Sequence, residues 1–206
     1  MWLNGIIYFL LCISSFLIVD ESMLHQDLSY DVYRRNKHIG EFVISRSVSR
    51  QSVHIDLHNT THFWLFGKKK LIYTVKNRFD QGILQTAFSK SMVNHRVRHE
   101  TKIVKDRSSG YLIYDKHKAD TLQLDIQSIN YTVAMMYFEE PSTYKEAYSE
   151  RFQKFLSIRR ITSQEYSLEL PNGNYNYFTY ENGVAREIEV NHPLVTIVFR
   201  LKNGSV

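Results

Sequence analysis

Cysteine is almost absent from this chain of 206 residues, and its scarcity limits both stabilisation and chemistry. The single cysteine, Cys12, lies inside an apolar run at the N-terminus. If that run is removed, no cysteine is left to form a disulfide or a thiolate site. The remaining chain, of about 185 residues, is long enough to be stabilised by a buried core.

Glycine and proline are also few, at 8 and 3 residues. The chain has no glycine-rich phosphate loop and no Gly-x-Ser-x-Gly sequence, so no nucleotide, flavin or other cofactor is implied. It also has no Pro/Ser/Gly-rich linker and no repeat, which predicts a single β-rich domain over residues 20–206. We expect a protein that is not an enzyme, although a hydrolase or a metal-dependent enzyme stays open because catalytic triads are recognised by geometry.

Charge is missing from the first nineteen residues. Met1 to Val19 carries no charged side chain, and Asp20-Glu21 ends the apolar run. The length of this run predicts a secretory signal peptide and an exported, periplasmic or envelope protein. Because no Lys or Arg precedes the run and no clear cleavage site follows it, a retained N-terminal membrane anchor and a buried core helix remain alternatives. Leu11 before Cys12 argues against lipidation.

The net charge of +5 invites a nucleic-acid hypothesis. The basic clusters are Lys68-Lys69-Lys70, Arg96-x-Arg98 and Arg159-Arg160. Each lies among alternating apolar residues or near a turn, which is typical of a solvated sheet face or a hairpin edge. We expect no nucleic-acid partner. Attraction to anionic lipid or polysaccharide outside the cell membrane is the better interpretation.

Alternation with a period of two dominates the rest of the chain. Val53, Ile55 and Leu57 alternate with His54, Asp56 and His58, which predicts a half-buried antiparallel strand. Turns are expected at Arg35-Asn36-Lys37, Asp80-Gln81-Gly82, Pro171-Asn172-Gly173 and Asn182-Gly183. The segments from Tyr166 to Leu201 therefore predict a meander of hairpins.

One segment has a different spacing. Ile129, Val133, Met136 and Tyr137 recur at intervals of three and four residues and predict a short helix near Ile129 to Phe138, ended by Glu140-Pro141. The stretch from Tyr144 to Leu156 fits a helix or a strand, and we favour the strand. A further hairpin turn is expected at Arg159-Arg160. The predicted fold class is mainly β: a single antiparallel, strongly curved sheet or open half-barrel with one short helix, preceded by a signal helix.

Several short motifs carry a family resemblance. They are Tyr30-x-Val32 with Ile39-Gly40, Tyr137-Phe138-x-Glu140-Pro141, Tyr148-Ser149-Glu150, and Leu170-Pro171-x-Gly173-x-Tyr175-x-Tyr177 with Tyr180-x-x-Gly183. Together they resemble an exported bacterial family of unknown function, the Bacteroidota-type family 6134. At the level of fold the chain also resembles periplasmic curved-sheet proteins of the lipoprotein-carrier type, whose open half-barrel holds acyl chains. Fold alone does not decide function.

Histidine provides the one constellation that could bind a metal. On a strand, His54, Asp56 and His58 share a face, with His54 and His58 about 13 Å apart. A His-x-Asp pair could share a metal ion with other ligands, whereas the two histidines could hardly do so alone. The competing interpretation, which we favour, is a solvated polar sheet face.

Two function classes remain. The first is a non-enzymatic envelope protein whose concave sheet face binds an apolar or amphipathic ligand such as a lipid; the candidates for ligand contact are Phe63, Trp64, Phe66, Tyr73, Tyr175 and Tyr177. Phe79, Phe88, Phe178 and Tyr180 belong to the same aromatic supply. The second is an interaction scaffold that contacts an envelope protein partner, or a membrane through residues 1–19. An ordinary β core uses the same aromatic residues.

The uncharged N-terminal run generates a first prediction. We expect the protein isolated from the envelope fraction of its host to begin near Asp20, and N-terminal sequencing measures this directly. An intact Met1 in the membrane pellet would identify an anchor, and recovery from the cytosol would contradict export.

Overall fold

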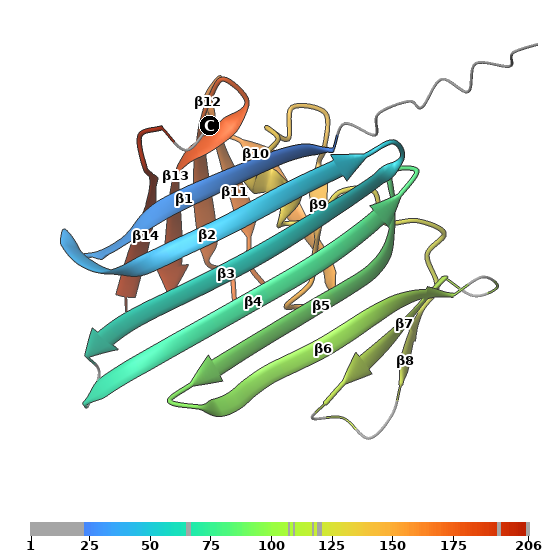
Figure 1. The fold of residues 1–206 in the computed structure, drawn as a ribbon, viewed down its shortest axis with the longest axis horizontal. Helices are drawn as coiled ribbons and strands as arrows, with labels where there is room; N and C mark the ends of the chain where they lie inside the picture. The colour runs from blue at the N-terminus through green and yellow to red at the C-terminus, as the bar shows by residue number, and fades with distance from the viewer. Residues whose placement is uncertain are drawn as a thin grey trace, which may run out of the picture.

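The computed structural model describes residues 23–64, 67–106, 108, 110–116, 118, 121–192 and 195–204. Within them the chain forms fourteen strands, shown in Figure 1. The strands are β1 (Leu24–Arg34), β2 (Lys37–Ser49), β3 (Ser52–Trp64), β4 (Lys68–Asp80), β5 (Ile83–Val93), β6 (Arg96–Asp106), β7 (Gly110–Asp115), β8 (Leu122–Leu124), β9 (Glu146–Ser149), β10 (Lys154–Arg160), β11 (Glu165–Glu169), β12 (Tyr175–Glu181), β13 (Val184–His192) and β14 (Val195–Leu201).

All fourteen strands belong to one antiparallel sheet. Its order is β8-β7-β6-β5-β4-β3-β2-β1-β14-β13-β12-β11-β10-β9, so β1 joins two meanders by pairing with β2 on one side and β14 on the other. Strands β8 and β9 are the two edges, and the sheet is not closed into a barrel. In Figure 1 the long strands β1 to β6 form a twisted front layer with β10 to β14 behind it. The predicted curved, open antiparallel sheet is confirmed.

The alternating sequence explains which side of the sheet is buried. In β3, Ile55 and Leu57 are buried, whereas His54, Asp56 and His58 are exposed. Successive side chains of a strand point to opposite faces, so the apolar set covers the inner face of the curved sheet and the polar set forms the outer face.

Four tight turns between strands lie where the sequence predicts them. Asn182 and Gly183 have φ values of 52° and 79°, the positive pair that a type I′ hairpin requires. Gln81 and Gly82 also have positive φ, as do Arg35 and Asn36.

The middle of the chain differs from the predictions. Between Ile129 and Phe138, all of which the structure describes, the helical part is Met135–Tyr137, the 3₁₀ turn η1, which is shorter than the predicted helix. Helical spacing appears here because the segment buries residues on several sides of an irregular path. Arg159 and Arg160 are the last two residues of β10, and the expected hairpin turn follows directly after them, before β11. The stretch from Tyr144 to Leu156 supplies β9 and the start of β10, as the favoured interpretation predicts.

This irregular path, residues 125–145, fills the inside of the curved sheet, and we call it the central segment. The ring of Tyr137 lies 4.9 Å from Phe42 of β2, 5.9 Å from Tyr30 of β1 and 6.0 Å from Phe178 of β12. One side chain of the central segment thus packs against strands from both halves of the sheet. Aromatic pairs of this kind contribute about 0.5–1.5 kcal/mol each beyond area burial.

Hydrogen bonds fix the central segment in place. Tyr180 Oη donates to the carbonyl of Met136 at 2.8 Å, and Glu140 N donates to the carbonyl of Gly183 at 3.1 Å. Close to the β9 edge, Val133 N donates to the carbonyl of Tyr148 at 3.0 Å. The motifs that carry the family resemblance therefore meet inside the fold, although they are far apart in sequence.

The N-terminal run, with the expected signal helix or anchor at residues 1–19, lies outside the described residues. None of the described residues belongs to a helix with the length and hydropathy that crossing a bilayer requires.

Turn glycines give a stability prediction. Gly173 and Gly183 have φ values of 80° and 79°, and a Cβ atom at either position would meet no neighbour within 4 Å. We expect Gly173→Val and Gly183→Val each to lower the free energy of unfolding by about 1 kcal/mol or more, through backbone strain alone.

Urea denaturation measures these changes. Gly183→Asn is the control, because asparagine tolerates positive φ and should cost clearly less than valine. Unchanged midpoints for both valine variants would contradict the turn geometry.

Candidate functional site

The three candidate metal ligands lie in a row on the outer face of β3. Asp56 forms an ion pair with Lys76 at 3.2 Å. His58 contacts the hydroxyls of Thr60 at 3.2 Å and Thr74 at 3.5 Å. Among the described residues, no three His, Cys, Asp or Glu side chains converge in a way that could hold a metal ion. The shared face follows the sequence prediction, and it is a solvated polar face over this part of the chain.

The aromatic candidates do not come together. Phe63 of β3 and Tyr73 of β4 share the inward-facing alternation of Thr61 and Val75, and both are half-buried. The side chain of Trp64, like the whole of Phe66, lies outside the described residues.

Strand β12 carries the two remaining aromatic candidates, Tyr175 and Tyr177. Tyr175 and Tyr177 alternate with Phe178 and Tyr180, which are buried in the core, so the two candidates lie on the opposite face of the strand. They do not line the concave face together with Tyr73. The side chains that occupy that face near Phe178 belong to the central segment.

A buried carboxyl group lies inside the fold, directly after the edge strand β9. Glu150, which follows β9, is 3% exposed. Its Oε1 accepts a hydrogen bond from Asn77 Nδ2 of β4 at 2.5 Å and faces the backbone N–H of Ala134 at 3.4 Å. The backbone carbonyl of Glu150 accepts from Thr101 Oγ1 of β6 at 3.3 Å. Glu150 therefore links β4, β6 and the central segment.

The neighbours of Glu150 are polar but uncharged. Asn77 Nδ2 also donates to Thr132 Oγ1 at 3.1 Å. Asn77 Oδ1 and Tyr148 Oη have no hydrogen-bond partner among the described residues. Burial raises the pKa of the Glu150 carboxyl, and the hydrogen bond from Asn77 opposes this change only in part.

Nearby tyrosines are affected by the same environment. Burial, with the Glu150 charge as a second cause, raises the pKa of Tyr73 to about 12. Burial and then the Glu150 charge also raise the pKa of Tyr148, and burial, followed by Tyr73 and Glu150, raises the pKa of Tyr137. The Glu150 carboxyl is closed to solvent, and its contact with Ala134 helps to hold the central segment in place. The sequence contains the motif Tyr148-Ser149-Glu150, yet nothing in that motif indicates that the acid is buried.

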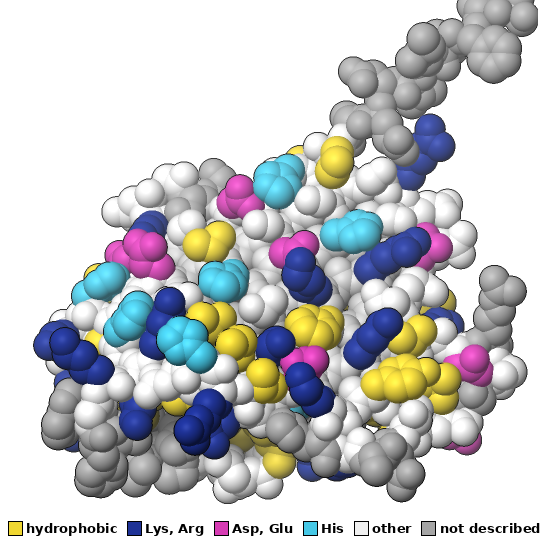
Figure 2. Space-filling view, turned by 60° about the horizontal axis from the view of Figure 1, so that its bottom comes forward, with side chains coloured by type: hydrophobic (Ala, Val, Ile, Leu, Met, Phe, Trp, Pro, Cys, Tyr) yellow, Lys and Arg dark blue, Asp and Glu magenta, His cyan; other side chains and the backbone are white. Residues whose placement is uncertain are grey.

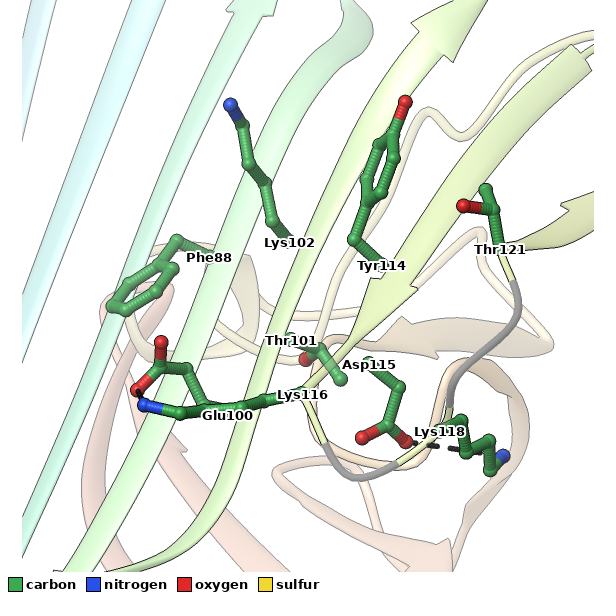
Figure 3. A pocket seen from close by; sticks show the side chains of 9 residues that line it. All are labelled: Phe88, Glu100, Thr101, Lys102, Tyr114, Asp115, Lys116, Lys118 and Thr121. Atoms are coloured by element: carbon green, nitrogen blue, oxygen red, sulfur yellow. Dashed lines mark hydrogen bonds and ion pairs between the residues drawn. The ribbon is translucent and has the colours of Figure 1, made fainter.

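An open cleft lies across β5, β6 and β7, mainly on the outer face of the sheet, with Thr101 and Asp115 contributing from the inner face. It has a volume of about 300 Å³. Phe88 pairs with Lys102, and Lys102 pairs with Tyr114, so these three side chains share the outer face. Figure 3 shows the side chains of Lys102 and Tyr114 pointing in the same direction, and Phe88 on β5, the strand next to that of Lys102. The remaining lining residues are Glu100, Thr101, Asp115, Lys116, Lys118 and Thr121.

Ion pairs neutralise part of the cleft. Glu100 contacts Lys90 at 2.8 Å and Lys116 at 3.5 Å, and the hydrogen bond from Lys90 is the main reason why the pKa of Glu100 is lowered. Asp115 contacts Lys118 at 3.8 Å. Lys102 has no acidic partner among the described residues. The cleft thus combines two aromatic side chains with one uncompensated positive charge.

Sequence reasoning included Phe88 among the aromatic residues but missed the cleft. Lys102 and Tyr114 meet Phe88 only through the register of three strands. The only available signal was the alternation in β6 and β7, which places both side chains on the exposed face.

The open, curved antiparallel sheet places this chain among proteins with a β-barrel-like fold. The chain is similar in fold to a crystal structure of a β-barrel-like protein of the domain of unknown function DUF1849 from Brucella abortus. The TM-score is 0.52 at 12% sequence identity, and the match covers 86% of this chain and 95% of the other. The chain itself belongs to the family described as domain of unknown function DUF6134, whose model matches residues 30–202. The family resemblance seen in the sequence is thereby confirmed. No curated protein matches the chain.

The buried carboxyl generates a pH prediction. An ordinary glutamate loses its proton near pH 4.3, and in the folded protein Glu150 keeps its proton to higher pH. Between these two pKa values the folded state binds more protons than the unfolded state, so the contribution of Glu150 to stability falls as the pH rises. The variant Glu150→Gln lacks this dependence.

We therefore expect the free energy of unfolding of the unmodified protein to fall relative to that of Glu150→Gln as the pH increases from 4 to 7. Urea unfolding at several pH values measures the difference. Glu150→Ala, which removes the acceptor for Asn77, should be less stable than Glu150→Gln by about 1–3 kcal/mol at every pH, because neither variant titrates at this position. A pH-independent difference between the unmodified protein and Glu150→Gln would contradict the raised pKa.

Proposed function

We propose that this protein is an exported, non-enzymatic binding module for an amphipathic anion, and that the ligand binds in the cleft of β5, β6 and β7. The observation that carries the proposal is the position of Lys102 between Phe88 and Tyr114. A carboxylate or phosphate group can pair with the ammonium group while an apolar chain contacts the two rings.

Size limits what the cleft can hold. Ligand pockets typically measure roughly 300–1,000 Å³, and this cleft lies at the lower end of that range. It fits a charged head group and the first part of an apolar chain, not a complete long acyl chain. The exposed fraction of Tyr114, 44%, leaves its ring available for contact with a ligand.

The concave face offers less support for the same function. An acyl chain inside the curved sheet would compete with Tyr137, which already contacts Tyr30, Phe42 and Phe178. The outer cleft is therefore the better location for an amphipathic ligand. A scaffold for an envelope protein partner is the alternative, and it is favoured by the packing of the interior against the chain's own central segment.

The proposal is tested by titrating the full-length protein with a dansyl-labelled undecanoate and recording dansyl fluorescence. We expect saturable binding that becomes roughly tenfold weaker in Lys102→Gln, because a charge-assisted hydrogen bond is lost. Tyr114→Ala should also weaken binding. The matched controls are Lys154→Gln and Tyr177→Ala, which alter the same residue types on β10 and β12, and they should bind like the unmodified protein.

No saturable binding, or an equal loss in the control variants, would contradict the cleft proposal. Native mass spectrometry of the protein purified from its host provides a second readout. A bound mass in the range of a small amphipathic molecule supports a binding module, and a stoichiometric protein partner without such a mass favours the scaffold.

A further inference from the structure

Strand β4 carries a basic stripe on its outer face, interrupted by Ile72 and Thr74. Residues that point outward alternate along the strand, and four of the six are basic: Lys68, Lys70, Ile72, Thr74, Lys76 and Arg78. At about 3.3 Å per residue the stripe is roughly 33 Å long. No outward side chain of β4 between Lys68 and Arg78 is acidic.

Little of this charge is neutralised by neighbouring strands. Asp56 of β3 pairs with Lys76 at 3.2 Å, and both side chains are more than half exposed. Lys70 and Arg78 have no acidic partner among the described residues; the side chains opposite them in β3 are those of His62 and His54. On the β5 side, Lys90 lies beside Thr74 and is paired with Glu100 of β6 at 2.8 Å. Figure 2 shows lysine, arginine and histidine side chains spread over this part of the surface, with isolated acidic ones between them.

We propose that the outer face of β3, β4 and β5 docks on an anionic lipid bilayer. Beyond the ligand cleft, this assigns the protein an interaction surface and a partner with a planar array of negative charge. The spacing favours an extended partner: Lys68 and Lys70, like Lys76 and Arg78, are roughly 7 Å apart, whereas the two pairs are about 20 Å apart. One small anion therefore contacts one pair only. Ile72 and Met92 lie half-buried between the charges and give the face a mixed basic and apolar character.

The lipid surface fits better than a nucleic acid. Proteins that bind single-stranded nucleic acid combine positive charge with exposed aromatic rings on which bases stack. In the described parts of β3, β4 and β5, the outward aromatic side chain is Phe88, which is half-buried. Ahead of β1, the chain also carries the uncharged run from Met1 to Val19, and the expected signal peptide or anchor in this run would bring the protein to a membrane.

The experiment measures binding of the full-length protein to phosphatidylcholine vesicles with and without 30% phosphatidylglycerol, by co-sedimentation. The contrast between the two vesicles isolates charge recognition, because insertion of the apolar N-terminal run does not depend on head-group charge. Each basic residue near an anionic membrane raises binding by roughly fivefold. We therefore expect Lys70→Glu with Arg78→Glu to lower the preference for phosphatidylglycerol by at least about tenfold.

Lys154→Glu with Arg159→Glu is the matched control, since it makes the same change in net charge on β10. It should keep the preference within about twofold of the unmodified protein, and raising the salt from 0.05 to 0.5 M should remove the preference. The milder pair Lys70→Gln with Arg78→Gln, expected to give a smaller loss in the same direction, replaces the first pair if that protein unfolds. An equal loss in the control, or an unchanged preference in both stripe variants, would overturn the proposal.

Two further measurements separate this inference from its alternatives. Tighter binding to a duplex DNA than to the anionic vesicles, lost in the same stripe variants, would identify a nucleic acid as the partner and overturn the membrane proposal. The stripe variants should still bind the dansyl-labelled undecanoate, and Tyr114→Ala should still prefer anionic vesicles. Failure of the docking surface is thus distinguishable from failure of the cleft.

Discussion

Hydrogen bonds between buried tyrosine hydroxyls and the backbone hold this structure together. A curved sheet that does not close must cover its inner face, and here the cover is a segment with almost no regular structure of its own. Such a segment cannot satisfy its backbone groups internally, and a buried, unpaired N–H or carbonyl is costly. Tyr180 and Tyr131 donate to carbonyls of the central segment, and Tyr111 accepts from Ile129 N while donating to Leu84. The tyrosine hydroxyls thus satisfy backbone groups of the central segment that a helix would satisfy with its own hydrogen bonds.

Glu150 extends the same principle to a group that can carry charge. Replacing a buried polar network by apolar residues is often neutral or stabilising, so such networks are weak evidence for stability. What this network supplies is position: the carboxyl contacts Asn77 and Ala134, and its backbone carbonyl accepts from Thr101. These contacts fix where the central segment lies against β4 and β6, which apolar packing alone leaves free to slide.

The sequence predicts the strands and turns of this fold better than the structure of the central segment. Alternation identifies β3, and the positive φ of Asn182 and Gly183 follows from residue type. The helix expected near Ile129 to Phe138 is reduced to η1, because spacing of three and four residues reports burial on several sides as readily as a helical face. The cleft and Glu150 were missed for a related reason. Lys102, Phe88 and Tyr114 meet through strand register, and the burial of Glu150 depends on chain segments far away in sequence.

The place of β1 in the sheet has a consequence for how the chain reaches its folded state. The first strand pairs with the last, Tyr30 opposite Leu201 and Val32 opposite Phe199, in the middle of the strand order. Each meander can form from neighbours in sequence, but the pairing that joins them connects β1 with β14, two strands far apart in sequence. Contacts of such long sequence separation form slowly. A growing chain therefore cannot complete this sheet until β14 has been synthesised, and until then β1 lacks one of its two partners and the two meanders stay unjoined.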